Sequence, residues 1–315
     1  MGRPAYRTDP SVSPRHLAAV SGGALLIALA PILAVASTRG ENGVGTWDAA
    51  FWRVALGTLA LGGLFLVRGR RLMPRRSDFR HGHAWIWLPG LAFAGDFWTW
   101  HWSFENTSVA NASLLCNLAT LFVAAYAWIV WKERLGLSFV CGALLALAGM
   151  GALVLSSAAR EPPAAGNPVF GDFLAVLTAG FYAVYQLSMK RYRDEHSAPV
   201  LLFWASLVAS LVLLPVALLH EAPFLPGSAA MWLPLLGLGF VSHFLGQGLI
   251  SWGIAGVPAS LGSVTLLLQP LGTALLAVPL LGQALVPWQI AGAIAVVFGL
   301  FLAVRGRRLA GRSGD

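Results

Sequence analysis

The stretch 95–102, GDFWTWHW, sets a carboxylate and an imidazole among indole rings inside a long apolar run. A carboxylate beside an aromatic face can bind an ammonium group through charge and cation–π attraction. At 100° per helical residue, Asp96 and Trp100 share one face, while Trp98 and Trp102 point roughly the other way. Asp96 and Trp100 are therefore predicted to face a substrate cavity.

Two further ionisable residues, Arg53 and His101, lie in apolar runs and are assigned to gating or ion pairing. At roughly 1.5 Å per residue, Arg53 lies about 8 Å and Asp96 about 12 Å from the outer surface, so they could meet. A structural pair is the alternative to direct substrate contact by Asp96, and the two roles are compatible. His101 is either an interfacial histidine or a pH-sensitive gate.

Polar side chains in hydrocarbon need a partner, water or a substrate, so three more are candidates for the cavity. His243 with Gln247 one turn later could bind a carboxylate or join helices by hydrogen bonds. Asn117 lies at mid-depth on a stripe of small polar residues that serves either packing or substrate binding.

A second set combines aromatic rings, amides and a proline. Tyr182, Tyr185 and Gln186 share one helical face, which is either a cavity wall or ordinary packing. Gln269 precedes Pro270, and a proline frees a backbone carbonyl that a bent helix can present to a ligand. The alternative for Pro270 is a plain packing kink.

The elements that must position these residues are membrane helices. Of the 315 residues, 57% are hydrophobic and only 11% are charged, which excludes a soluble globule and a disordered chain. The apolar runs are continuous and about 20 residues long, as a helix needs to cross the bilayer. Ten spans are predicted, at 16–38, 47–67, 83–104, 107–131, 137–157, 170–189, 198–219, 231–252, 258–281 and 286–304.

Basic residues fix the predicted orientation. With the N-terminus in the cytoplasm, all but three of the 21 Lys and Arg fall in the tails and cytoplasmic loops. The exceptions are Arg39 and Arg160 outside, and Arg53 within a span. The net charge of +8 is thus an orientation signal and not a nucleic-acid patch. Residues 34–36 (AVA) look like a signal-peptidase site, but the first span has a counterpart in the second half, which favours its retention.

The chain repeats itself at an offset of about 150 residues. Five spans per half means that the second half is inverted in the membrane, as in many secondary transporters. We predict a first repeat at 1–157 and a second at 158–315. The matched positions pair Ser113 with Ser263, Trp102 with Trp252, Gly142 with Gly292, Gly149 with Gly299, and Trp87-Leu88-Pro89 with Trp232-Leu233-Pro234.

Several segments resemble the ten-helix EamA-type branch of the drug/metabolite transporter superfamily. They are 106–123, the run WKERL at 131–135 with the glycines that follow, and 263–270 with its own glycines. The resemblance implies a cavity lined by spans one to four and six to nine, with five and ten behind. Two residues depart from the pattern: Thr120 replaces a proline, which implies a softer bend, and Gln283 replaces a glutamate.

The resemblance and the repeat together predict a bacterial inner-membrane exporter, with both termini cytoplasmic, that works by alternating access. Its expected substrates are small amphipathic metabolites, above all aromatic or neutral amino acids. The rivals are a multidrug or organic-cation exporter of the same fold and a non-transport scaffold or sensor. No enzyme activity, metal or cofactor is expected, and the partners are a small-molecule substrate and the lipid bilayer, with a monomer as the simplest assembly.

Overall fold

The computed structural model describes residues 12–69, 84–158, 166–193, 195–220, 222–282 and 285–312. All regular secondary structure within those ranges is helical, as predicted. Several residues used above lie outside them, among them Gln283, Arg160 and most basic residues of the N-terminal tail and the 70–80 loop.

Five predicted spans of the first half appear as helices. The first is broken into α1 and α2, and the fourth into α5 and α6. The bounds are α1 Pro14–Ile27, α2 Ala30–Ser37, α3 Thr46–Val67, α4 Ala84–Asn106, α5 Val109–Cys116, α6 Ala119–Ile129 and α7 Leu137–Ala158.

The second half repeats this order with different interruptions. Its third span changes helix type along its length, and its fourth is broken like that of the first half. The bounds are α8 Pro168–Tyr192, α9 Ala198–Leu219, η2 Ala229–Met231, α10 Trp232–Leu236, the π-helix η3 Gly237–Gln247, α11 Gly248–Gly253, η4 Ile254–Gly256, α12 Ala259–Thr265, α13 Leu268–Leu281 and α14 Pro287–Arg312.

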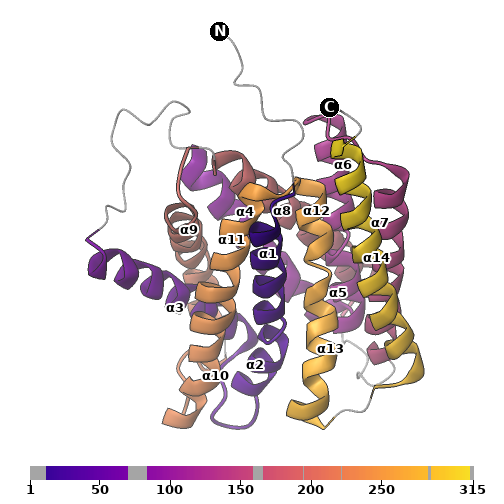
Figure 1. Ribbon diagram of the computed structural model, residues 1–315. Helices are drawn as coiled ribbons and strands as arrows, with labels where there is room; N and C mark the ends of the chain where they lie inside the picture. The colour runs from indigo at the N-terminus through magenta and orange to yellow at the C-terminus, as the bar shows by residue number, and fades with distance from the viewer. Residues whose placement is uncertain are drawn as a thin grey trace.

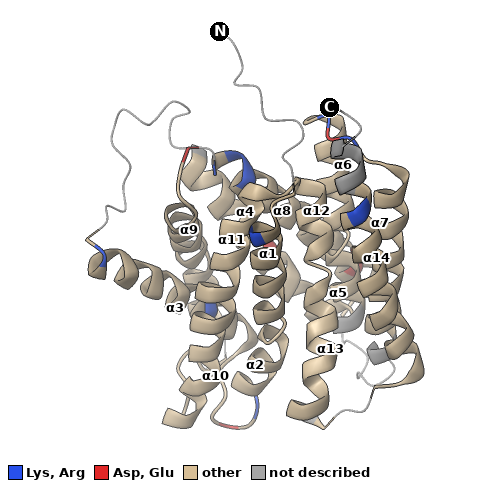
Figure 2. Ribbon diagram, in the orientation of Figure 1, with Lys and Arg blue, Asp and Glu red and all other residues tan. Residues whose placement is uncertain are grey.

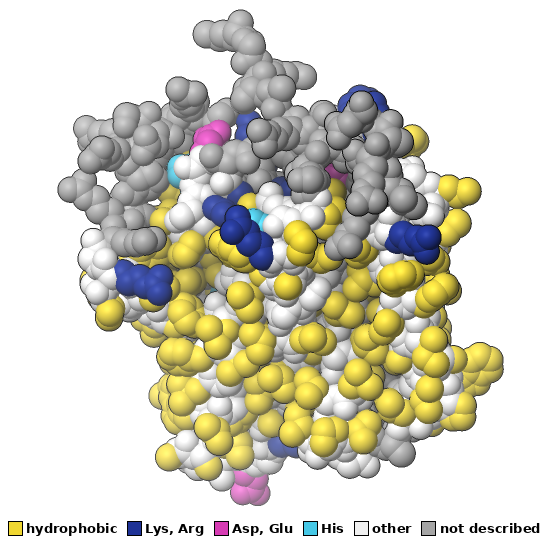
Figure 3. Space-filling view, viewed as in Figure 1, with side chains coloured by type: hydrophobic (Ala, Val, Ile, Leu, Met, Phe, Trp, Pro, Cys, Tyr) yellow, Lys and Arg dark blue, Asp and Glu magenta, His cyan; other side chains and the backbone are white. Residues whose placement is uncertain are grey.

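The surface is that of a membrane protein. Within the described residues, nine segments are long and apolar enough to cross a bilayer. The predicted third span, α4, is 23 residues long but carries Asp96, His101 and Glu105. Figure 3 shows hydrophobic side chains over most of one face, and Lys and Arg gathered towards one end. This is the end where α1 begins and α14 finishes (Figures 1 and 2), called the terminal end below.

Contacts between the halves come in related pairs, as an inverted repeat requires. Span three (α4) packs on span six (α8), and the equivalent span eight (η3 and α11) packs on span one (α1). In the same way, α4 packs on span seven (α9), and η3 packs on span two (α3). The pairs α3–α9, α6–α12 and α7–α14 each join equivalent spans of the two halves. The predicted fold class, ten spans in two inverted five-helix repeats, is confirmed.

Backbone details place the repeat in register at an offset of 150. Lys132 and Gly282 both adopt a left-handed conformation, with φ of 56° and 66°. The helix breaks at Asn117–Leu118 and at Leu266–Leu267 correspond to within one residue of the same offset. Span four is interrupted over two residues, as span nine is, although Thr120 stands at the position equivalent to Pro270.

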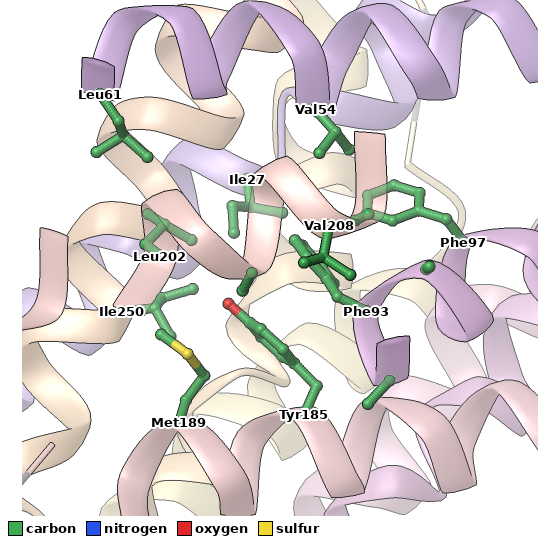
Figure 4. Close-up of a cluster of buried hydrophobic side chains, with 14 of the residues drawn as sticks. Ile27, Val54, Leu61, Phe93, Phe97, Tyr185, Met189, Leu202, Val208 and Ile250 are labelled. Atoms are coloured by element: carbon green, nitrogen blue, oxygen red, sulfur yellow. The ribbon is translucent and has the colours of Figure 1, made fainter. Parts of the chain in front are cut away.

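Glycines allow α7 and α14 to pack closely along their length. A Cβ on Gly142 would lie 2.5 Å from the Gly299 carbonyl oxygen, and one on Gly149 would lie 2.6 Å from that of Gly292. These small residues therefore serve packing within one chain. A separate cluster of buried apolar side chains joins α3, α4, α8, α9 and α11. Figure 4 shows some of its members, among them Phe93, Tyr185 and Leu202.

Candidate functional site

A cavity of about 330 Å³ lies between the two halves. Broken or bent spans near the middle of the bundle contribute much of its wall, as in other inverted-repeat transporters. Its polar lining comes from both halves and consists of Arg53, Asp96, Trp100, Ser113, Cys116, Asn117, Thr120, Thr178, Tyr182, Gln186, Gln247, Gln269, Thr273 and Gln289.

The structure brings most of the predicted site residues together here. Those lining the cavity are Arg53, Asp96, Trp100, Asn117, Tyr182, Gln186, Gln247, Gln269 and Pro270. Three predicted residues, Tyr185, His101 and His243, are not part of the lining. Spans five and ten are not simply behind the cavity, since Leu153 and Val154 of α7 and Gln289 of α14 also line it.

Helical pitch explains why α4 supplies so much of the wall. Phe93, Asp96, Phe97 and Trp100 recur every three to four residues and line the cavity. Trp98 and Trp102, on the other face, are exposed on the outside of the molecule.

Arg53 and Asp96 both face the cavity but form no ion pair with each other in the described part of the chain. The pairing considered from the sequence is thus not made in this conformation. The Arg53 guanidinium instead lies over the Phe97 ring, 5.3 Å from its centroid, and its Nε is buried with no hydrogen-bond partner. Both charges remain available to a ligand.

Aromatic rings make the apolar part of the wall. Phe93 stacks on Tyr185 with centroids 4.3 Å apart, and the Tyr182 ring lies nearly parallel to that of Tyr185 with centroids 6.1 Å apart. Tyr185 is thus a support behind the lining and not a part of it. Its ring lies beside Phe93 in Figure 4. Thr99 and Thr178 share a hydrogen bond of 2.7 Å that joins α4 to α8.

The helix breaks leave backbone carbonyls that side chains partly satisfy. Asn117 Nδ2 donates to the Ser113 carbonyl (2.6 Å), and Thr273 Oγ1 donates to the Ala28 carbonyl (2.8 Å) across the halves. Pro270 lies in the first turn of α13, where its missing N–H costs no helical hydrogen bond. It therefore starts a helix at the break and does not kink one.

His243 and Gln247 join helices. His243 is fully buried, with Nε2 2.8 Å from Ser206 Oγ, and Gln247 Nε2 donates to the Tyr185 hydroxyl at 2.9 Å. A Cβ on Gly57 would lie 2.3 Å from the His243 ring, so glycine lets α3 approach η3 closely. Only Gln247 of the pair also reaches the cavity.

His101 is buried among aromatic rings in the last part of α4. Its Nδ1 lies 2.7 Å from the Phe97 carbonyl, one turn earlier in α4. The rings of Trp47, Trp100 and Phe104 surround it at 5.4 to 5.8 Å.

Two buried charged residues, which the sequence analysis counted as a loop charge or left unassigned, make hydrogen bonds near the terminal end. Glu133 accepts hydrogen bonds from the backbone N–H of Ala259 (2.8 Å) and the hydroxyl of Ser260 (2.6 Å), and so caps α12. Lys190 Nζ donates to the carbonyls of Ile254 (2.8 Å) and Val257 (2.5 Å). Glu133 thus holds the start of span nine, and Lys190 holds the end of span eight and the loop that follows it.

Sequence reasoning missed several lining residues. Thr273 and Gln289 are polar residues within apolar spans, the same signal that identified Asn117, and they could have been found by it. Thr178 in α8 carries the same signal, whereas the apolar Phe97 does not, because its place in the wall depends on how α4 packs.

An inverted repeat of five helices with a polar cavity at the junction defines the architecture of a secondary transporter. The comparisons agree with that class. The chain belongs to the EamA-like transporter family, which matches it twice, over residues 17–155 and 169–305.

The individual relatives found have low sequence identity to this chain, between 19% and 29%. An uncharacterized transporter of Archaeoglobus fulgidus is 24% identical over 264 residues, covering 81% of this chain and 86% of the relative. A mouse protein named UDP-N-acetylglucosamine transporter TMEM241 is 29% identical over 106 residues, about one third of each chain. A protein of known crystal structure aligns with a TM-score of 0.75 over 91% of this chain and 96% of its own, at 19% identity, which shows the fold alone.

Proposed function

We propose that this protein is a secondary transporter that exports small amphipathic metabolites, chiefly aromatic and neutral amino acids. The observation that carries the proposal is one cavity between inverted halves that combines a carboxylate, a guanidinium and an aromatic wall. Its volume of about 330 Å³ is near the lower end of the roughly 300–1,000 Å³ of ligand pockets. A small substrate fits such a space. Binding and release of a substrate, without chemical conversion, is the activity proposed.

Alternating access is the proposed mechanism. The lining reaches the end opposite the termini through Ala277, Leu285 and Gln289, whereas Glu133 and Lys190 seal the terminal end. With the termini in the cytoplasm of a bacterial inner membrane, as the basic residues favour, this is an outward-facing state. The inverted repeat supplies the inward-facing state by exchanging the conformations of the halves.

Two other substrate classes are the competing candidates. Asp96 favours organic cations, but Arg53 in the same cavity opposes them. The name of the mouse relative points to nucleotide sugars. Their diphosphate would meet one cation and one carboxylate here, in a cavity at the small end of the range, so this class is disfavoured.

The test is flux through purified protein in vesicles. Proteoliposomes preloaded with unlabelled L-phenylalanine should accumulate labelled L-phenylalanine by exchange, whereas protein-free vesicles should not. Labelled tetraphenylphosphonium and labelled UDP-N-acetylglucosamine test the rivals in the same vesicles. Absence of exchange across a broad panel of amino acids would refute the proposal, and exchange of either rival alone would replace it.

A further inference from the structure

Arg53 and Asp96 are the charged side chains among the described residues that line the cavity. They do not form a contact ion pair with each other, and Arg53 Nε is buried without a hydrogen-bond partner. Charges held in low-dielectric surroundings without a partner are costly, so such a pair is retained where a ligand completes it. The site therefore lacks both an anion and a cation.

The Arg53 side chain is held for an anion. The Phe97 ring lies beneath the guanidinium at 5.3 Å, which supports the positive charge without using its N–H donors. The planar fork of those donors matches a carboxylate. The carbonyl of Phe97 is already taken by His101, so it does not compete for the guanidinium.

The Asp96 carboxylate is placed for a cation. It immediately precedes Phe97 in α4, and Trp100 follows one turn later on the same face. An ammonium group at Asp96 can therefore also lie against the indole ring. Arg53 reaches the cavity from α3 and Asp96 from α4, so the two poles stand on different helices of the first half.

We propose that Arg53 and Asp96 form the two poles of a zwitterion site, in which Arg53 binds the substrate carboxylate and Asp96 binds its ammonium group. The inference rests on the proposed transport function and assigns its specificity. A substrate with both charges satisfies both residues. An analogue with one charge leaves the other residue unpaired, which lowers its affinity about 10- to 100-fold. The apolar side chain of the substrate then packs on Phe93, Trp100 and Tyr182.

The experiment compares three ligands of one shape on the purified full-length protein: L-phenylalanine, phenethylamine without the carboxylate, and 3-phenylpropionate without the amine. Equilibrium binding is measured in lipid nanodiscs with radiolabelled forms. The native protein should prefer L-phenylalanine by about tenfold or more over each analogue. The variants are Arg53→Gln and Asp96→Asn, with Arg39→Gln and Glu41→Gln in the exposed α2–α3 loop as matched controls.

Asp96→Asn should lose the preference for L-phenylalanine over 3-phenylpropionate and keep the preference over phenethylamine. Arg53→Gln should show the reverse. Asp96→Asn should bind 3-phenylpropionate several-fold more tightly than the native protein does, because the repulsion between two carboxylates is gone. Arg53→Gln should do the same for phenethylamine. A misfolded variant cannot produce such gains, and the loop controls should keep the native order of the three ligands.

Uniform weakening of all three ligands in both variants would overturn the zwitterion site, and so would absence of binding to the native protein. Failure of the transport proposal has a different signature. L-Phenylalanine would then bind with the predicted preferences but would not exchange across vesicles. Exchange of L-phenylalanine without preference over its analogues would leave transport standing and refute the site.

Discussion

At the scale of single residues, the cavity wall follows the pitch of α4. Asp96 and Trp100 face inward, whereas Trp98 and Trp102 are 43% and 39% exposed on the outside. The same residue type thus has two roles within five positions. An indole in the wall gives the substrate a large apolar surface, and an indole outside contacts lipid.

Replacing Trp100 by alanine should therefore weaken transport much more than the same change at Trp98. Loss of a large buried apolar contact is worth about 1.5–3 kcal/mol, so half-saturation for L-phenylalanine exchange should rise at least about tenfold in Trp100→Ala. Trp98→Ala is the control, and its half-saturation should stay within about twofold. Equal effects of the two changes would contradict the assignment of faces.

At the scale of elements, close contacts hold equivalent spans of the two halves together. Helices α7 and α14 touch through reciprocal glycines, and α6 meets α12 where Thr120 Oγ1 donates to the Ser263 carbonyl at 3.3 Å. The first contact is apolar and continuous, as a fixed support would be. The second lies beside the break in span four, where a change of conformation can be accommodated.

The glycine contact predicts a stability difference between two identical substitutions. Gly142→Ala places a Cβ 2.5 Å from the Gly299 carbonyl oxygen, and overpacking of this kind costs about 1–3 kcal/mol. Gly63→Ala in α3 meets nothing within 4 Å and should be neutral or slightly stabilising through helix propensity. Thermal unfolding in detergent should show a lowered Tm for Gly142→Ala alone. A lowered Tm for both, or for neither, would contradict the packing account.

The cap made by Glu133 predicts a change in access at the terminal end. Without its carboxylate, the N–H of Ala259 loses its acceptor, and loss of a helix cap costs about 0.5–2 kcal/mol. Glu133→Ala should therefore open this end more often. A cysteine placed at buried Val123 should react faster with a charged thiol reagent applied from the terminal side.

Glu195→Ala is the matched control at the same end, since Glu195 forms a partly exposed ion pair of 3.9 Å with Arg191 that contributes little. In Glu195→Ala, the rate at which the Val123→Cys thiol reacts should be unchanged. Equal acceleration in both variants would indicate loosening of the whole end, and no acceleration in Glu133→Ala would show that the cap does not control access.

At the scale of the whole molecule, much of the architecture could be read from the sequence. Span count, inversion and register follow from hydropathy, charge placement and self-similarity, which are local or pairwise properties. The inward face of α4 followed because a regular helix has a fixed pitch. The break in span one lies just before Pro31, a signal that the span count did not use, whereas the break in span four has no proline beside it.

The alternatives that the sequence left open have a common physical origin. The roles of Tyr185 and His243 depend on which helix of the other half faces them, and one sequence does not specify that packing. His243 and Gln247 also lie in the π-helix η3, whose wider turn changes the angle between successive side chains. The caps by Glu133 and Lys190 join residues distant in sequence, so loop charge alone suggested only orientation.

The central claim is that the cavity between the halves is the transport site and is reached from the end opposite the termini. A cysteine at Ala274, a small residue of its wall, tests this in a Cys116→Ser, Cys141→Ser background. A separate Cys116→Ser protein, which keeps native Cys141 on the outer surface of α7, is the control for a thiol outside the cavity.

The measurement is the rate at which a charged, membrane-impermeant thiol reagent labels Ala274→Cys from each side of oriented vesicles. We predict labelling from the side opposite the termini, slowed at least severalfold by saturating L-phenylalanine. Labelling at Cys141 should not respond to the amino acid. Labelling of Ala274→Cys that saturating L-phenylalanine leaves unchanged, or that occurs only from the terminal side, would contradict the account.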